Sequence, residues 1–175
     1  MTALTRTPDN TNFLQPSKFI LTFGRIPTVQ YFCQEANLPG VALGSTKFDT
    51  PLLDIPIAGN KLTYNQLQVN FIVDESIQSW TELYNWLRAF GSPKSLSDRS
   101  NQSILQTGGN APLNNYSEAT LTVMSALNNP LFRVNYHKLF PTSLSDIQFD
   151  VKNSADTIIT ATASFAYEYF EITRA

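Results

Sequence analysis

Apolar and polar residues alternate along most of this chain, and a period of two is typical of β-strands with one buried face. The first alternating segment places Phe19, Leu21 and Phe23 on one face, and a more regular one begins with Leu67 and Val69. From this pattern we expect strands over residues 17–23, 28–35, 64–73, 118–125, 131–140, 146–152 and 157–173.

The last of these segments is the longest, because its alternation continues over residues 157–173. At about 3.3 Å per residue an unbroken strand of this length would exceed about 50 Å, whereas strands usually have five or six residues. We therefore expect this strand to bend or to extend beyond its own domain.

One segment shows the three- and four-residue spacing of an amphipathic helix instead. Its start, Asp74-Glu75, suits the partial positive charge of a helix N-terminus, and Gly91 and Pro93 would end it. We expect a helix over about residues 76–91, with one apolar face formed by Ile77, Trp80, Leu83, Tyr84, Leu87 and Phe90.

Residues 40–61 contain short apolar runs that Pro51 and Pro56 interrupt. Such a segment is too apolar for a solvated loop and too rich in proline for a central strand, so a long, partly extended hairpin or loop is expected. Its exposed apolar side chains would need a partner surface. The predicted interface residues in this segment are Leu52, Leu53, Ile55 and Ile57.

The remaining segments divide the chain into an arm and one domain. Residues 1–16 are polar and lack apolar periodicity, so they predict an N-terminal arm, and residues 17–175 predict a single domain. Residues 92–115 form a connection rich in Ser, Asn and Gly, longer than compact domains usually contain. We expect that connection to be functional or mobile.

The charge content narrows the classes of partner. Charged residues make up only 15% of the chain, against about 25% in typical soluble domains, and Asn, Gln, Ser and Thr take their place. Uncharged polar surfaces are less costly to cover with a partner than charged ones. The net charge of −2 provides no basic stripe for tight nucleic-acid binding, and no apolar run is long enough to insert in a membrane.

Candidate catalytic residues are few, because the chain has one histidine and one cysteine. His137 has no second ligand at metal-binding spacing, so a surface or interface histidine is expected. Cys33 is expected to be a small buried side chain, and Asp74-Glu75 a helix cap. We predict neither catalysis nor a cofactor or metal.

Six short motifs follow one another between residues 13 and 171. They are Phe13-Leu-Gln-Pro16, Phe32-Cys33-Gln34, Leu38-Pro39-Gly40, Ile55-Pro56-Ile57-Ala58-Gly59-Asn60, Leu139-Phe140-Pro141-Thr142 and Ala166-Tyr167-Glu168-Tyr169. In order and spacing they resemble the tail tube protein family of contractile-tailed bacteriophages. The resemblance implies a mostly β fold, an antiparallel β-sandwich or partial barrel with one flanking helix, whose sheets continue between the subunits of a ring.

The resemblance also implies a function and a set of partners. Six copies would close into a ring, and stacked rings would form the tube that conducts DNA during ejection without binding it specifically. Residues 41–60 would reach a neighbouring subunit, which adds Val41 to the interface. The implied partners are further copies, the tail sheath protein, and the baseplate and tape-measure proteins, in a virion assembled in the host cytoplasm.

A bore that lets DNA slide would need uncharged polar walls, because lysine or arginine would retain the phosphates. The polar rows of two predicted strands could supply them, or they could be an ordinary solvated sheet face. The candidate lumen-facing residues are Gln66, Gln68, Asn70, Thr160, Thr162 and Ser164.

Several other functions stay open on the sequence. A baseplate protein that initiates the tube, or a terminator ring at its other end, would share the fold. A type VI secretion tube protein is a more distant alternative. A small enzyme or carbohydrate-binding β-sandwich would use the aromatic side chains of the predicted helix, Trp80, Tyr84 and Trp86, as a platform.

Overall fold

A computed structural model describes residues 13–91, 115–152 and 157–174 of the chain. The described residues form nine strands and two helices. In chain order these are β1 (Phe19–Phe23), α1 (Pro27–Phe32), β2 (Cys33–Ala36), β3 (Val41–Asp49), β4 (Asp54–Tyr64), β5 (Leu67–Ile72), α2 (Gln78–Phe90), β6 (Ser117–Met124), β7 (Pro130–Leu144), β8 (Thr160–Ala166) and β9 (Tyr169–Arg174).

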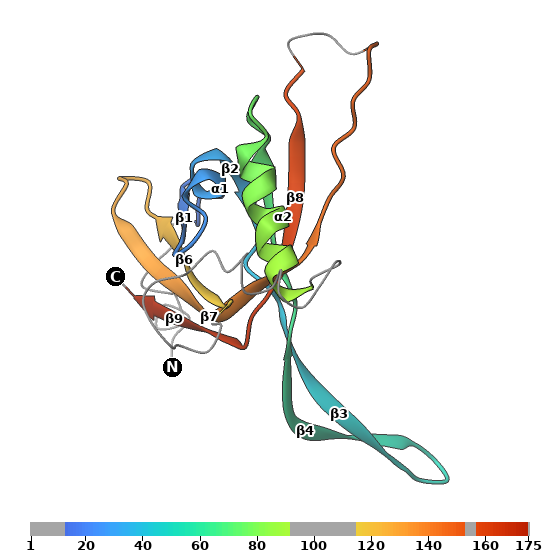
Figure 1. The fold of residues 1–175 in the computed structure, drawn as a ribbon. Helices are drawn as coiled ribbons and strands as arrows, with labels where there is room; N and C mark the ends of the chain where they lie inside the picture. The colour runs from blue at the N-terminus through green and yellow to red at the C-terminus, as the bar shows by residue number, and fades with distance from the viewer. Residues whose placement is uncertain (1–12, 92–114, 153–156, 175) are drawn as a thin grey trace, which may run out of the picture.

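Strand β7 belongs to two antiparallel sheets (Figure 1). Its first part pairs with β6 and β9, and β1 pairs with the far side of β6, which makes the first sheet, β1-β6-β7-β9. Its second part, from Phe140 to Leu144, pairs with β8, and the second sheet continues through β5 to β2. Over the described residues the sheets do not close into a barrel, and the predicted mostly β, antiparallel fold is confirmed.

The core lies between the two sheets and α2. Alternate residues of β1, β5, β6 and β8 are buried, as the period of two predicts for 17–23 and 64–73. The largest fully buried side chains are Trp86, Tyr136, Phe71 and Phe165. Trp86 comes from α2, so this helix completes the core that the strands leave open on one side.

The helix predicted over 76–91 is α2, but its buried face differs from the predicted one. Leu83 and Trp86 are buried with Ser79 and Ala89, whereas Ile77 and Tyr84 are exposed. Ile77 precedes the helix in a left-handed conformation, with φ of 56°. Trp80 and Phe90 of the predicted face do pack against the core while partly exposed, so the buried face keeps part of the expected apolar stripe and adds Ser79, Trp86 and Ala89 to it.

The strand predicted over 28–35 is wrong, because Pro27–Phe32 form helix α1 and only Cys33–Ala36 form a strand. Proline is favoured in the first turn of a helix, where its missing N–H is not needed. Val29 is buried, and its partner on the same helix face, Phe32, packs against the core. Val29 and Phe32 are three residues apart, which is the spacing of one helix face. The apolar residues between and beside them also fit a period of two, so the sequence pattern predicts a strand instead.

The strand predicted over 146–152 is also wrong. Residues 145–150 are irregular and lead into a turn, in which Asp150 Oδ1 accepts a hydrogen bond from the Lys152 amide at 2.9 Å. Phe149 and Val151 are exposed and have no core to pack against. The expected bend in 157–173 is present: β8 and β9 are separate strands, and between them the Glu168 amide donates to the His137 carbonyl.

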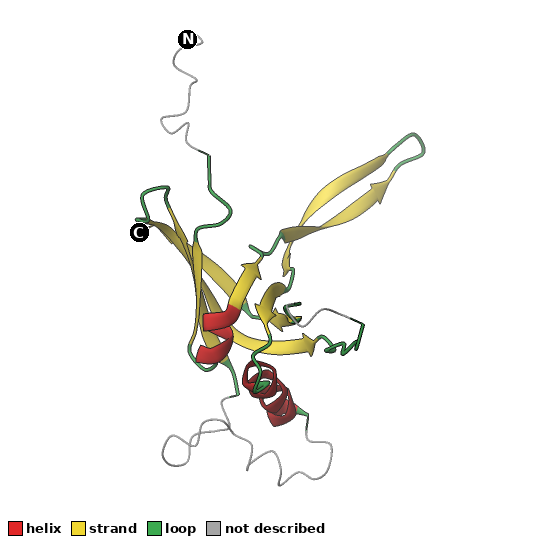
Figure 2. Ribbon diagram, turned by 90° about the horizontal axis from the view of Figure 1, so that it is seen from above, coloured by secondary structure: helices red, strands yellow, loops and turns green. Residues whose placement is uncertain are grey.

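Among the described strands, β3 and β4 pair only with each other, and they project from the body (Figures 1 and 2). The expectation of a hairpin in 40–61 is therefore confirmed. Of the predicted arm, residues 1–12 lie outside the described residues, as do residues 92–114 of the predicted long connection.

Candidate functional site

The projecting hairpin is the outer continuation of a ladder that starts in the second sheet. β2 pairs with β5, and after a short interruption β3 pairs with β4, so one ribbon runs from Ala36 and Val69 outward through Val41 and Tyr64. At the interruption the side chain of Asn37 adds to the backbone bond that the Asn37 N–H donates to the Gln68 carbonyl. Its Oδ1 accepts from the Gln68 amide at 2.6 Å, and its Nδ2 donates to the Gln66 carbonyl at 3.2 Å.

Aromatic packing holds the base of the hairpin to the body. Tyr64, at the end of β4, contacts Tyr167 and Phe170 with ring centroids 5.9 and 5.5 Å apart. The Tyr167 hydroxyl donates to the Asn65 carbonyl at 2.7 Å, and partial burial raises the pKa of Tyr167 to about 12. The base is therefore fixed, and the hairpin leaves the body in a defined direction.

The hairpin presents apolar side chains on both of its faces. Near the body, Val41 and the facing pair Leu43 and Leu62 share one side, which we call the proximal patch. Nearer the tip, strand alternation puts Phe48, its partner Ile55, and Ile57 on the opposite side, which we call the distal patch. All six side chains are exposed.

The change of face coincides with an irregularity in the ladder between Leu43 and Ser45. Two glycines meet there, and a Cβ on Gly59 would lie 2.5 Å from the Gly44 carbonyl oxygen. Backbones approach this closely only when glycine occupies the position. The two glycines thus allow the backbones of β3 and β4 to approach closely at the irregularity that separates the proximal patch from the distal patch.

The tip of the hairpin is a short, hydrogen-bonded turn from Thr50 to Leu53. The Thr50 amide donates to the Leu53 carbonyl at 3.3 Å, and the Leu53 amide donates to Thr50 Oγ1 at 3.1 Å. Pro51 restricts the backbone further. The turn presents Leu52 and Leu53 to solvent, 97% and 69% exposed.

All five predicted interface residues, Val41, Leu52, Leu53, Ile55 and Ile57, lie on this hairpin and are exposed. The prediction that they contact another subunit stays a prediction. Sequence reasoning missed Leu43, Phe48 and Leu62, which extend the same patches. Pairing β3 with β4 about a turn at Pro51 would have identified them, because Phe48 and Leu43 then face Ile55 and Leu62.

The candidate lumen residues come together on one face of the second sheet. Gln68 pairs with Ser164, Asn70 with Thr162, and Ile72 with Thr160, so the polar side chains of β5 and β8 alternate with the buried ones. Gln66 lies just before β5, outside the ladder. The polar rows that the sequence predicts on two separate strands therefore lie side by side on one surface.

That surface is uncharged over its two central strands, and the first acidic side chain, Glu35, lies beside Asn70 on edge strand β2. The outward face of the first sheet differs. There Arg133, Glu171 and His137 are interspersed with threonines, and His137 Nδ1 lies 3.8 Å from Glu118 Oε1. A wall along which DNA slides should neither bind nor repel phosphates strongly, and the uncharged face of the second sheet fits this requirement better than the charged face of the first sheet.

Cys33 and Asp74, two of the few candidates for chemistry in the sequence, have contacts that stabilise the fold. Burial raises the pKa of the Cys33 thiol to about 11, so it is protonated at neutral pH. Asp74 accepts hydrogen bonds from the Ser76 hydroxyl, the Gln78 amide and both the amide and hydroxyl of Ser79, and these bonds, that from Ser76 foremost, hold its pKa well below the ordinary value. It is the helix cap that the sequence predicts.

His137 stacks on Tyr169, with ring centroids 4.7 Å apart, on the first sheet. Across residues 13–91, 115–152 and 157–174, no three His, Cys, Asp or Glu side chains gather as a metal site would require. Over the same ranges, neither helix has the length and apolar character needed to cross a membrane.

Comparisons with known proteins agree with this arrangement. A family model described as phage tail tube protein matches residues 9–173. The tail tube terminator protein of Enterobacteria phage T4 is 25% identical over 170 residues, which cover 92% of this chain and 89% of that protein.

Two solved structures share the fold. The tube-terminating cap of the anti-feeding prophage aligns over 100% of both chains with a TM-score of 0.66 and 13% identity. The sheath–tube complex of an extracellular contractile injection system in its extended state aligns over 94% of each chain, with a TM-score of 0.61 and 12% identity.

Proposed function

Because the chain belongs to the phage tail tube protein family, we propose that six copies of it close into a ring of the inner tube of a contractile tail, through which DNA passes during ejection. The observation that carries this proposal is the projecting hairpin with its two exposed apolar patches. A monomer rarely exposes so many large apolar side chains on one projection, and another copy is the partner always present.

The edges of the second sheet support a ring. Within the described residues β2 pairs with β5 alone, and Phe140–Leu144 of β7 pair with β8 alone, so both ends of this sheet expose backbone groups. Successive antiparallel pairings make β2 and β7 run in opposite directions. Joining β2 of one copy to β7 of the next would therefore continue the antiparallel sheet and protect both edges.

In such a ring the polar face of β5 and β8 would line the bore. Lysine introduced at both Gln68 and Thr162 should leave rings intact but slow the passage of DNA, because each ring would then hold twelve added positive charges against the phosphates, from two substitutions in each of six copies. DNA release from particles carrying the variant measures the effect. The control is Gln148→Lys with Val151→Lys, on an exposed segment outside both sheets. Equal release from both variants would contradict the lumen assignment.

The interface role of the hairpin has its own test. Removing residues 50–58 should abolish rings and leave a folded monomer, because β3 and β4 take no part in either main sheet. Negative-stain microscopy scores the rings, and circular dichroism scores the fold. A truncated protein that still formed rings would refute this role.

A repeating ring and a terminating ring are both compatible with this geometry. The curated relative is a terminator, and it matches nearly the full length of both proteins, which favours a terminating ring. The similar cap of the anti-feeding prophage supports the same position. Purified protein that stays as single rings would favour the terminator, and long uniform tubes would establish the repeating subunit.

The proposed partners follow from position. The sheath–tube complex among the similar structures supports a contact between this chain and a sheath protein. Baseplate and tape-measure proteins would meet a tube at its end and within its bore, and assembly would take place in the host cytoplasm. Mass spectrometry of cross-linked tails would identify which of these proteins lies next to this chain.

A further inference from the structure

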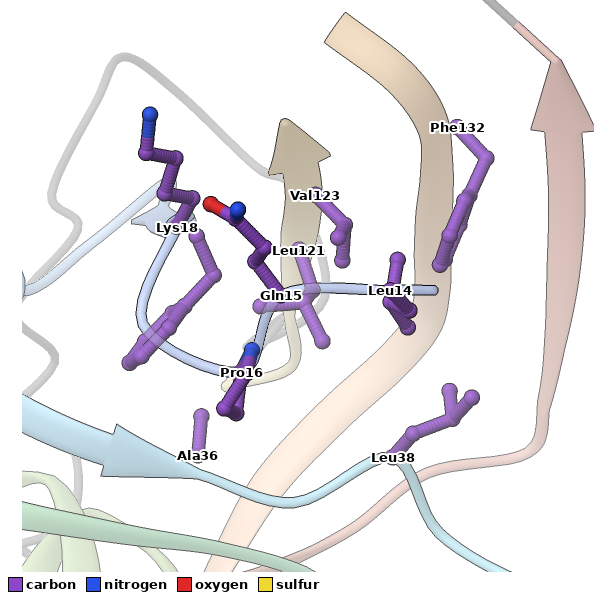
Figure 3. A pocket seen from close by; sticks show the side chains of 10 residues that line it. Leu14, Gln15, Pro16, Lys18, Ala36, Leu38, Leu121, Val123 and Phe132 are labelled. Carbon is purple, nitrogen blue, oxygen red and sulfur yellow. The ribbon is translucent and has the colours of Figure 1, made fainter. Parts of the chain in front are cut away.

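An apolar hollow opens between the first sheet and the chain around the end of β2, and none of its lining residues comes from α2. It has a volume of about 120 Å³ and is lined chiefly by Leu14, Phe19, Leu38, Leu121, Val123 and Phe132 (Figure 3). These residues come from the segment before β1, from β1 itself, from the segment after β2, and from β6 and β7.

The polar groups around the hollow point away from it. Lys18 contributes its stem to the wall, and its Nζ donates to the Ala126 carbonyl at 2.6 Å, outside the cavity. Figure 3 shows the Lys18 amine and the Gln15 amide directed away from Leu38 and Phe132. The surface of the hollow is therefore mainly apolar, with a smaller polar share, so it suits an apolar side chain.

The geometry points to the hairpin tip of a second copy as the occupant: we propose that Leu52 of one subunit inserts into this hollow on its neighbour, while Leu53 packs at the mouth of the hollow. The proposal rests on the ring proposed above and names the surface that receives the hairpin. Leu52 is the most exposed leucine among the described residues, and the hollow has the dimensions of about one large aliphatic side chain.

The tip is prepared for such a contact before it forms. Hydrogen bonds between Thr50 and Leu53, together with Pro51, hold the turn in one conformation. A rigid projection loses little conformational freedom when it docks, so more of the apolar contact appears as affinity. A flexible loop carrying the same leucines would lack this advantage.

The projection and the hollow lie on different parts of the chain. In both overall views the hairpin leads away from β1 and β6, and a ladder about 30 Å long cannot return its tip to its own hollow (Figures 1 and 2). A contact between two unlike surfaces of the same chain is heterologous, and repeated heterologous contacts form a ring when the rotation between copies closes and an open helical array when it does not. The arrangement is therefore compatible with the ring of the proposed function.

Disulfide trapping tests the contact. In a Cys33→Ser background, Leu53→Cys is combined with Leu38→Cys, at the mouth of the hollow, and a second pair combines Leu52→Cys with Leu14→Cys. The matched control pairs Leu53→Cys with Val151→Cys, which is fully exposed on another segment. Each protein is assembled, oxidised and examined on non-reducing gels, with circular dichroism to verify folding and microscopy to score rings.

We expect at least one hollow pair to give a ladder of cross-linked species that a reducing agent returns to monomer, and the control pair to stay monomeric. Rings without a ladder, or a ladder equal to that of the control, would overturn the contact and leave the ring intact; the hollow would then take another segment or another protein. Absence of both rings and ladder from folded protein would overturn the proposed function as well.

Discussion

Two hydrogen bonds join Asn37 and Gln68. The backbone N–H of Gln68 donates to the side-chain oxygen Oδ1 of Asn37 at 2.6 Å, and the backbone N–H of Asn37 donates to the Gln68 backbone carbonyl at 3.2 Å. The pair stands where the second sheet ends and the hairpin begins. It therefore links the polar face proposed for the bore with the projection proposed for the neighbour.

Asn37→Ala should loosen this junction. Loss of the side-chain bonds to Gln66 and Gln68 should lower the free energy of unfolding by only about 1 kcal/mol, because both bonds are solvent-accessible. Hydrogen exchange in 41–64 should increase and ring formation should fall more than stability does. Asn37→Asp is the control, since it keeps the acceptor for the Gln68 amide. Equal exchange rates in wild type and Asn37→Ala would contradict the role.

Gly59→Ala should distort the hairpin without unfolding the body. The added Cβ would lie 2.5 Å from the Gly44 carbonyl oxygen, so one backbone must move. Assembly should fail while the melting temperature stays near that of the wild type. Gly91→Ala is the matched control, because a Cβ there meets no atom within 4 Å. If Gly59→Ala formed normal rings, the close crossing would not determine the shape of the hairpin.

Asp74→Ala should destabilise α2 in a pH-dependent manner. At pH 7 loss of the cap should cost about 1 kcal/mol of unfolding free energy. Because hydrogen bonds, from Ser76 foremost, hold the pKa of Asp74 below its unfolded value of about 3.9, the stabilisation is complete above that value and is lost as pH falls toward the folded pKa. Urea denaturation at pH 7 and pH 3 measures it. A difference between wild type and variant that grew on acidification would contradict this sign.

Trp86→Phe should destabilise the core. Trp86 is fully buried, and its Nε1 donates to the Asn115 carbonyl at 2.7 Å, while Asn115 Nδ2 donates to the Ala89 carbonyl. The substitution leaves a buried acceptor without its donor and should cost about 1–3 kcal/mol in thermal or urea unfolding. Trp80→Phe removes a similar bond, to the Ser145 carbonyl, at a partly exposed site and should cost less. The reverse order of the two costs would contradict the assignment of Trp86 to the core.

Cys33 should react slowly with iodoacetamide in the native protein. Burial raises the pKa of its thiol to about 11, so little thiolate exists at pH 8, and the rate should still be rising near pH 10. Unfolding in urea should restore the rate of an ordinary cysteine. Rapid modification of the folded protein at pH 8 would indicate a reactive thiol instead.

Alternation along the chain identified the strands β1, β5, β6, β7 and β8, because each of them has buried residues on one face. It also located the apolar hairpin through Leu52, Leu53, Ile55 and Ile57. It failed over 28–35, where Val29 and Phe32 satisfy a helical spacing that begins at Pro27. It failed over 146–152 because Phe149 and Val151 alternate with polar residues but face solvent.

Two features of the site depend on pairings that no local pattern contains. Alternation shows that Gln68 and Thr162 are not core residues, but their common face requires β5 to pair with a strand nearly a hundred residues away. The hollow is built from four separate segments, so no motif predicts it. The resemblance to tail tube proteins predicted a ring. The residues that would line its bore or receive the hairpin form surfaces only once the strands have paired.

The shared strand β7 has a consequence for the order in which a newly made chain can fold. β6 and the first part of β7 form a local hairpin through the turn at Ser125 and Asn129, so they can pair as soon as both have left the ribosome. The second sheet cannot, because β8 lies between β5 and β7 and is synthesised after every other strand in it. Until β8 arrives, β5 has only the short β2 beside it, and the proposed bore wall and the base of the hairpin stay incomplete. The order of synthesis thus completes the polar wall and the base of the hairpin only after β8 has been made.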